Sequence, residues 1–174
     1  MTSQLNDDVI LSAVLAYWHR LRGERAMPSR REIDPIGLGA KVLPYVVLVD
    51  VVRGEHEPRY RFRLCGTAVA DAAGLDLTGH YVDELNPNPD YARYIIGLYG
   101  RLLDVRRPLY SESAYLTPAR NARRSTRRLM CPLSEDGVAV HHVLVGQTFV
   151  DVTRLDPPSM TYAETFQPGM EEVL

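Results

Sequence analysis

The 174-residue chain contains little cysteine and almost no lysine. Its two cysteines, Cys65 and Cys131, stand far apart, and neither belongs to a CxxC motif. Two isolated thiols provide no disulfide framework and cannot by themselves complete a structural zinc site. Lys41 is the single lysine, so arginine supplies nearly all of the positive charge.

Long apolar runs are also missing. No window approaches the roughly 20 apolar residues of a membrane-spanning helix, and the opening residues MTSQLNDDVI lack the basic and apolar regions of a secretory leader. Lysine and arginine together number 20 against 22 acidic residues, so the net charge of −2 shows no basic excess of the kind that binds nucleic acid. We therefore expect a cytoplasmic protein that binds neither membrane nor nucleic acid.

Motifs of the common enzyme classes are absent as well. The chain has no GxSxG, no Walker loop, no HExxH, and no glycine spacing of a dinucleotide-binding fingerprint. The sequence therefore predicts a protein without catalytic activity. One enzymatic alternative stays open, a cone-shaped α+β scaffold resembling ketosteroid isomerase, which requires Asp71 or Tyr81 to lie inside a deep pocket.

Hydrophobic periodicity predicts the secondary structure. Apolar residues from Val9 to Leu21 recur at helical spacing. Tyr60, Phe62 and Leu64 alternate with arginines and predict a strand with one apolar face. The same criteria predict the other elements, namely a strand at 45–52, a short helix at 67–73, a long helix at 90–105, and strands near 109–116, 125–133 and 138–151.

The order of these elements predicts an α+β fold. Two strands, a helical middle and three further strands indicate a five-stranded antiparallel sheet with short helices on one face, preceded by an N-terminal helix. The predicted units are an N-terminal helix and linker at 1–44, the sheet domain at 45–152, and a loosely ordered, proline-containing C-terminal tail at 153–174.

Several segments resemble one family in the right order and spacing. The stretch RFRLCGTAVADAAGLDLTGHYVDEL, residues 61–85, leads from a strand through Gly66 and a small-residue helix to a glycine-containing corner. With YWHRLRGERAMPSRREIDP and VLPYVVLVDVV upstream, it resembles the PAS domain, and more specifically the short stand-alone PAS proteins abundant in alphaproteobacteria. The resemblance covers residues 10–150 and implies a sensory or regulatory domain in signalling, without catalytic output.

The PAS resemblance implies a small ligand between the sheet and the helices, a protein partner, or both. The candidate lining residues come from apolar faces, with two polar handles added: Phe62, Leu64, Cys65, Tyr94, Leu98, Met130 and His142. The alternative is an interaction or dimerisation module with a filled core, in which Ala68 and Gly74 serve only close packing. No cofactor is identified, since Cys65 lies outside the Asn-Cys-Arg-Phe-Leu-Gln motif of flavin-binding relatives.

The N-terminal helix and the outer side of the sheet predict a homodimer. Arg59, Arg61 and Arg63 share the outward side of their strand, where they can pair with acidic residues of a neighbouring element or subunit. PAS domains often dimerise through such a flanking helix and sheet face. A signalling partner protein is the second expected contact.

Arginines and histidines in the last predicted strands suggest further sites. The arginine cluster consists of Arg120, Arg123, Arg124, Arg127 and Arg128. With the turn at 134–137 it resembles part of the cyclic-dinucleotide motif of PilZ domains, but Pro132 stands where that motif needs Asp or Asn, so a solvated face is predicted. His141 and His142 are adjacent on a strand, point to opposite faces, and cannot both bind one metal; with His80 they are expected to be structural, one of the pair inside and one outside.

Overall fold

The computed structural model describes residues 3–85, 89–117, 122–154 and 166–174. Its helices are α1 (Ser3–Asp7), α2 (Val9–Arg22), α3 (Pro35–Leu38), α4 (Thr67–Ala73) and α5 (Pro89–Val105), and its 3-10 turns are η1 (Arg30–Glu32), η2 (Leu43–Tyr45) and η3 (Val82–Glu84). Its strands are β1 (Val46–Val52), β2 (Arg59–Cys65), β3 (Leu109–Thr117), β4 (Ala122–Leu133), β5 (His142–Arg154) and β6 (Phe166–Val173). The α+β class predicted from the sequence is confirmed.

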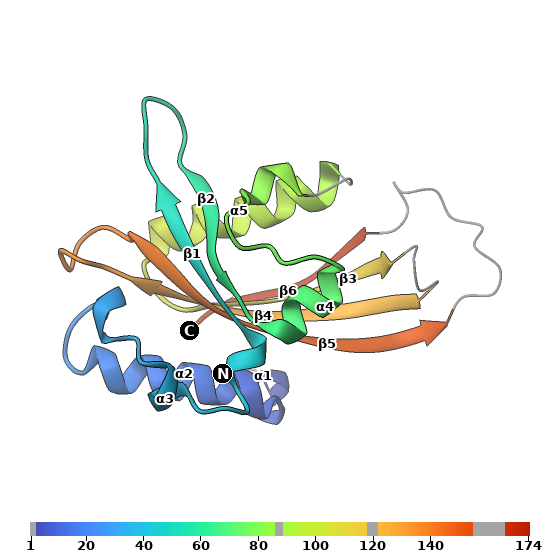
Figure 1. Ribbon diagram of the computed structural model, residues 1–174, viewed down its shortest axis with the longest axis horizontal. Helices are drawn as coiled ribbons and strands as arrows, with labels where there is room; N and C mark the ends of the chain where they lie inside the picture. Colours follow the sequence, from blue (N-terminus) through green and yellow to red (C-terminus); the bar gives the residue numbers. More distant parts are fainter. Residues whose placement is uncertain (1–2, 86–88, 118–121, 155–165) are drawn as a thin grey trace.

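The strands described here form one antiparallel sheet of six, in the order β2–β1–β5–β4–β3–β6. The N-terminal helices lie on one side of this sheet and α5 lies on the other (Figure 1). We call the side covered by α2 the outer face and the side covered by α5 the inner face. Because successive side chains of a strand point to opposite sides, each strand contributes alternate residues to each face.

Helix α2 packs on the outer face of its own sheet. The Asp8 carboxylate caps its first turn by accepting a hydrogen bond from the Leu11 N–H at 3.0 Å. Gly146 of β5 leaves room for the helix, because a Cβ there would lie 3.0 Å from the Leu11 side chain. The Trp18 indole N–H donates to the Pro132 carbonyl at 2.8 Å. The N-terminal helix therefore shares one hydrophobic core with the sheet.

Helix α5 packs on the inner face. Its buried residues recur at helical spacing along one side: Ile95, Leu98, Tyr99 and Leu102. The Tyr99 ring stacks on the Tyr60 ring of β2 with 4.5 Å between centroids. In the part of the chain described here, no helix has both the length and the apolar character needed to cross a membrane.

The sixth strand departs from the sequence prediction. Strand β6 pairs with β3 at the sheet edge, and the Leu174 N–H donates to the Pro108 carbonyl at 2.8 Å. Residues 166–173, expected to be loosely ordered, therefore add a strand to the predicted five. Its sequence FQPGMEEV carries Pro168 and Gly169, which argue against a strand, but an edge strand tolerates both.

Gly66 separates β2 from the small-residue helix α4, and its surroundings explain why this position is a glycine. Its N–H donates to the Val46 carbonyl at 2.8 Å, which brings the start of α4 against η2. A Cβ on Gly66 would lie 2.4 Å from the Pro44 carbonyl oxygen and 2.7 Å from that of Leu43. Both obstacles are backbone atoms, so no side-chain rotation relieves the contact.

We expect Gly66→Ala to lower the free energy of unfolding by about 1–3 kcal/mol, because the new methyl group forces the η2 backbone away from α4. The measurement is urea unfolding followed by circular dichroism. Gly97→Ala is the matched control: nothing lies within 4 Å of its Cβ position in α5, and alanine in a helix raises stability by about 0.5–1 kcal/mol relative to glycine. Equal effects of the two substitutions would contradict the close approach at Gly66.

Candidate functional site

The layer between the inner face and α5 has an apolar half and a polar half. Leu109, Met130 and Val145 form one row across β3, β4 and β5, and all three are buried. Two residues earlier on β4 stands Arg128, which faces Ser111 of β3, and both are also buried. A purely structural core has no need of this second, polar row, because apolar side chains fill such a space at lower cost.

Arg128 is a buried cation in this polar row. It is 6% exposed, its Nη1 donates to the Ser113 hydroxyl at 3.2 Å, and its Nη2 donates to the Tyr91 hydroxyl. Its guanidinium also lies 5.6 Å from the centre of the Tyr91 ring. Among the described residues, no carboxylate forms an ion pair with it within 4.0 Å. Since arginine does not lose its proton in proteins, this charge is held by neutral groups.

Three tyrosines of the layer between the inner face and α5 stay protonated at neutral pH. Burial raises the pKa of Tyr94 on α5, and the nearby Glu171 carboxylate raises it further. Burial also raises the pKa values of Tyr60 and Tyr99. These tyrosines are therefore neutral hydrogen-bonding groups and bring no negative charge to the layer.

Glu171 of β6 is the acidic residue in the same row of the inner face, since it pairs with Ser111 on the far side from Arg128. Its carboxylate accepts a hydrogen bond from Nη1 of Arg101 on α5 at 2.5 Å. That pair joins the edge strand to the helix. The Glu171 carboxylate therefore compensates the positive charge of Arg128 only from a distance.

The structure places five of the seven proposed ligand contacts on the inner side of the sheet or on the facing side of α5: Phe62, Cys65, Tyr94, Leu98 and Met130. Leu98 and Met130 are buried within the core, and burial raises the pKa of the Cys65 thiol. Leu64 and His142 lie on the outer face, so these two are separated from the others by the sheet.

A β-bulge explains the position of Leu64. Phe62 pairs with Val49 and Leu64 pairs with Leu48, so Arg63 is an extra residue between two consecutive partners. One extra residue reverses the alternation beyond it. Leu64 therefore points to the outer face, where it is 47% exposed, and the prediction that it shares a face with Phe62 is wrong.

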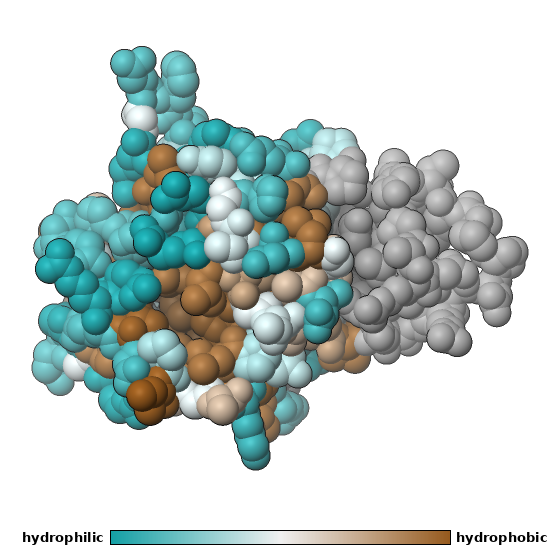
Figure 2. Space-filling model, in the orientation of Figure 1, coloured by the Kyte–Doolittle hydropathy of each residue, from teal (hydrophilic) through white to brown (hydrophobic). Residues whose placement is uncertain are grey.

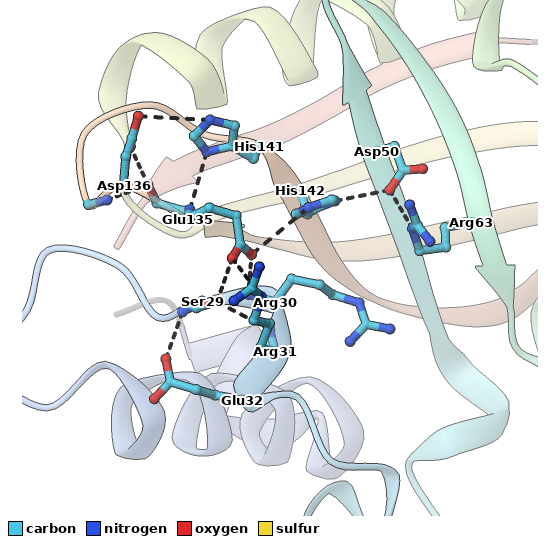
Figure 3. A network of polar contacts seen from close by, with 12 residues as sticks. Ser29, Arg30, Arg31, Glu32, Asp50, Arg63, Glu135, Asp136, His141 and His142 are labelled. Atoms are coloured by element: carbon cyan, nitrogen blue, oxygen red, sulfur yellow. Dashed lines mark hydrogen bonds and ion pairs between the residues drawn. The ribbon is translucent and has the colours of Figure 1, made fainter.

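The same bulge brings two arginines to one buried carboxylate on the outer face. Asp50 of β1 has a side chain that is 7% exposed. It accepts a hydrogen bond from Arg61 Nη2 at 3.0 Å. It also accepts one from Arg63 Nε at 2.6 Å, and His142 Nδ1 lies 2.9 Å away (Figure 3). Burial opposes ionisation of Asp50, but the hydrogen bonds from Arg63, Arg61 and His142 outweigh it, so the pKa of Asp50 lies below its ordinary value.

This network continues to the N-terminal segment. His142 Nε2 lies 4.0 Å from a carboxylate oxygen of Glu135, in the turn between β4 and β5. Glu135 in turn accepts hydrogen bonds from the Ser29 hydroxyl at 2.9 Å and the Arg30 N–H at 3.0 Å (Figure 3). Burial opposes ionisation of Glu135, yet the bonds from Ser29 and Arg30 hold its pKa below the usual value. The contacts join η1, the β4–β5 turn and the β1–β2 hairpin.

The predicted arginine cluster does not form one solvated face. Arg128 is buried on the inner face, whereas Arg127 lies on the outer face, 3.6 Å from the Glu112 carboxylate. The expectation of a solvated face is therefore wrong for Arg128. Arg120 and the side chains of Arg123 and Arg124 lie outside the described residues.

The remaining candidates have ordinary surroundings. Asp71 is exposed on α4, so it does not lie inside the deep pocket that the ketosteroid isomerase alternative requires. The guanidinium carbon of Arg59 lies 3.9 Å from the centre of the Tyr81 ring. His141 accepts a hydrogen bond from the Glu135 N–H at 3.2 Å, and both it and His142 are partly buried among polar groups. Within the described ranges, no three His, Cys, Asp or Glu residues gather as metal ligands.

Arg128 and Asp50 were not identified from the sequence as site residues, although the pattern of residues around each of them indicates such a role. Arg128 stands two positions before Met130, so strand alternation alone puts both on one face. Asp50 interrupts the otherwise apolar run VVLVDVV, next to a strand rich in arginine. A charged residue on a strand with two buried faces requires a partner, and that requirement identifies both positions.

We expect Asp50→Asn to lower the free energy of unfolding at pH 7 by about 2–3 kcal/mol, because the two arginines lose the charged acceptor of their hydrogen bonds. The folded pKa of Asp50 lies below the unfolded value of about 3.9. Its contribution is therefore complete above that value and disappears as the pH falls through the folded pKa. Urea unfolding of both proteins from pH 7 down to pH 3 measures the difference.

The matched control is Asp83→Asn. Asp83 pairs with Arg59 at 3.0 Å, but both side chains are more than two fifths exposed, at 42% and 45%, and such surface pairs contribute at most about 1 kcal/mol. A loss of stability on Asp50→Asn that is no larger than that of the control, or that persists unchanged at pH 3, contradicts the role assigned to Asp50.

Comparison with known proteins identifies the family. The model of the PAS domain family matches residues 8–144 of the chain, and a search of curated proteins finds no significant match. The matched region begins at the cap of α2 and ends within β5, so it contains the N-terminal helix, the β1–β2 hairpin, the helical segment with α4 and α5, and the central strands. The resemblance seen in the sequence is confirmed: the chain belongs to the PAS domain family.

Proposed function

We propose that this PAS domain is a regulatory module that binds a small molecule between the inner face of its sheet and α5. The PAS family is one of sensory and regulatory signalling modules. The observation that carries the proposal is the buried polar row on the inner face, with the Arg128 guanidinium held by the hydroxyls of Ser113 and Tyr91. A filled core would be expected to be apolar there.

The same groups connect a ligand to the position of α5. Tyr91 of α5 contacts Arg128 of β4, and Arg101 of α5 binds Glu171 of β6. A ligand that takes the place of either contact favours one position of the helix over another, and it shifts the population by its difference in affinity for the two. The signal is then a change at the outward side of α5 or at the edge strand.

The chemistry of the layer supports a role without catalysis. General acid–base catalysis works best with groups whose pKa lies near the working pH. Tyr94 and Tyr99 have pKa values raised by burial, which moves these values further from neutral pH. These groups bind and orient a molecule, but they do not exchange protons with it at neutral pH.

We further propose that the outer face near the β1–β2 hairpin contacts a second copy of the chain. Helix α2 packs on β4 and β5, so it leaves the outer side of the hairpin to other contacts. Figure 2 shows apolar side chains gathered in a hollow between this hairpin and the N-terminal helices. Leu64 and Ile36 are exposed apolar residues of these two elements. This surface accounts for the predicted homodimer better than the part of the sheet that α2 covers.

Native mass spectrometry of freshly purified protein tests the ligand site. We expect a mass above the 19.6 kDa of the chain, with the excess lost on denaturation, because a bound small molecule leaves when the layer opens. A visible absorption spectrum of the same sample identifies a coloured cofactor. Protein that is ligand-free in every preparation, and that no metabolite mixture stabilises against heat, contradicts the proposed ligand.

Leu64→Asp tests the dimer. Light scattering after gel filtration is expected to give a dimer for the wild type and a monomer for the variant, because a carboxylate in an apolar contact is left without a partner. Leu75→Asp is the control, since Leu75 is similarly exposed but lies between α4 and η3. A wild-type monomer at tens of micromolar, or equal effects of both substitutions, rules out this surface.

A further inference from the structure

We infer that the inner face binds an organic monocarboxylate, whose two oxygens pair with the guanidinium of Arg128. The inference rests on the proposed ligand site and specifies its chemistry. Arg128 lies in β4 between β3 and β5, under Tyr91 of α5, so a molecule that reaches it occupies the layer between helix and sheet.

The donors of Arg128 are only partly used. Its hydrogen bonds to Ser113 and Tyr91 occupy one N–H each, and a guanidinium has five in a rigid fork. A hydroxyl such as that of Ser113 can turn its own proton toward an anion while it accepts from the arginine. A carboxylate beside Arg128 would therefore meet the remaining N–H groups of the guanidinium together with the Ser113 hydroxyl.

The charge of Arg128 requires a counter-charge. A buried ion without a partner of opposite sign is strongly destabilising, and buried charges in proteins are normally paired. The carboxylate nearest along the row, Glu171, already binds Arg101 on α5. Nothing in the described ranges supplies Arg128 with an ion-pair partner, so an anionic ligand completes the row.

The charge balance favours a carboxylate over a phosphate. A phosphate group carries about −1.5 to −2 charges at neutral pH, whereas Arg128 is a single cation. The neighbouring cations on α5 are engaged: Arg101 binds Glu171 and Arg93 binds Asp90. A planar group with one negative charge and two acceptor oxygens matches the guanidinium fork in both charge and shape.

The rest of the ligand lies next to apolar side chains. Met130 forms an apolar row with Leu109 and Val145, beside the row of Arg128. No polar residue follows Met130 on the same face of β4. Leu98 of α5 is buried in the same core. An acid group attached to an apolar body therefore suits both halves of the layer, and benzoate and hexanoate are suitable probes.

The experiment measures thermal unfolding of the full chain with acetate, hexanoate and benzoate, at an ionic strength held constant with sodium chloride. Benzamide serves as the neutral counterpart of benzoate, and inorganic phosphate as the alternative anion. We expect at least one carboxylate with an apolar body to raise Tm by about 5–10 °C at a concentration near 100 times its Kd. The signal of the Met130 methyl group should shift in the same titration, whereas benzamide and phosphate should have no effect.

Arg128→Met tests the residue, and Arg93→Met on the exposed side of α5 is the control. The first substitution should weaken carboxylate binding at least tenfold, since a hydrogen-bonded charge is lost; the second should leave it unchanged. Without ligand, Arg128→Met should be no less stable than the wild type, because an unpaired buried charge has been removed. If Arg128→Met does not fold, the comparison of benzoate with benzamide on the wild type still decides the question.

The remaining outcomes separate this inference from the proposed function. A neutral molecule found by native mass spectrometry, with no response to any carboxylate, overturns the carboxylate and leaves the ligand site in place. Phosphate binding that depends on Arg128 overturns the charge argument. No bound molecule and no response to any probe overturn both proposals.

Discussion

The central strands β1, β4 and β5 of this PAS domain are buried on both faces over much of their length, and that constraint governs their polar residues. A charged side chain on a central strand cannot reach water, so it must find a partner within the protein or in a bound molecule. On the outer face Asp50 meets this requirement through two arginines and a histidine. On the inner face, within the part of the chain that the structure describes, Arg128 meets it through hydroxyl groups alone. The two faces therefore differ in kind: one is internally neutralised and structural, and the other is left with an unmatched charge.

Two glycines without side chains allow the layers to approach closely, and one inserted residue redirects the side chains of β2. Gly146 leaves room for α2, and Gly66 allows α4 to start against the η2 backbone. On β2 one extra residue, Arg63, changes the direction of the side chains that follow and places a second guanidinium beside Asp50. The bulge thus has two results, a neutralised carboxylate and an exposed Leu64. A single backbone irregularity connects the stability of the hairpin to the surface that it presents.

The sequence predicts the fold better than the site, for physical reasons. Helix α2 and strands β1 and β2 follow strong periodic patterns, and the order of elements indicated the family that the comparison confirms. Strand β6 carries proline and glycine, which argue against a strand. It forms because it pairs with β3 at the edge of the sheet, and that pairing depends on tertiary structure. The face of Leu64 depends on a bulge, which leaves no mark in an alternating pattern. Arg128 resembles its exposed neighbours in type, and only its position relative to Met130 distinguishes it. Periodicity predicts elements, but the pairing of charges depends on which elements meet.

The docking of α2 has a consequence for the way in which the chain folds. Its partners come from much later in the sequence: Trp18 bonds to Pro132, and the N-cap residue Asp8 bonds to Thr148, over separations of 114 and 140 residues. Ser29, the N-cap of η1, bonds to Glu135 over 106 residues. Contacts between such distant segments are typical of slow folding, because a long loop must close before they contribute. During synthesis the apolar side of α2 emerges before β4 and β5 and has no surface to cover until those strands have formed. Helix α2 is therefore completed only after segments that are made later, and until then its exposed apolar stripe is open to association with other proteins.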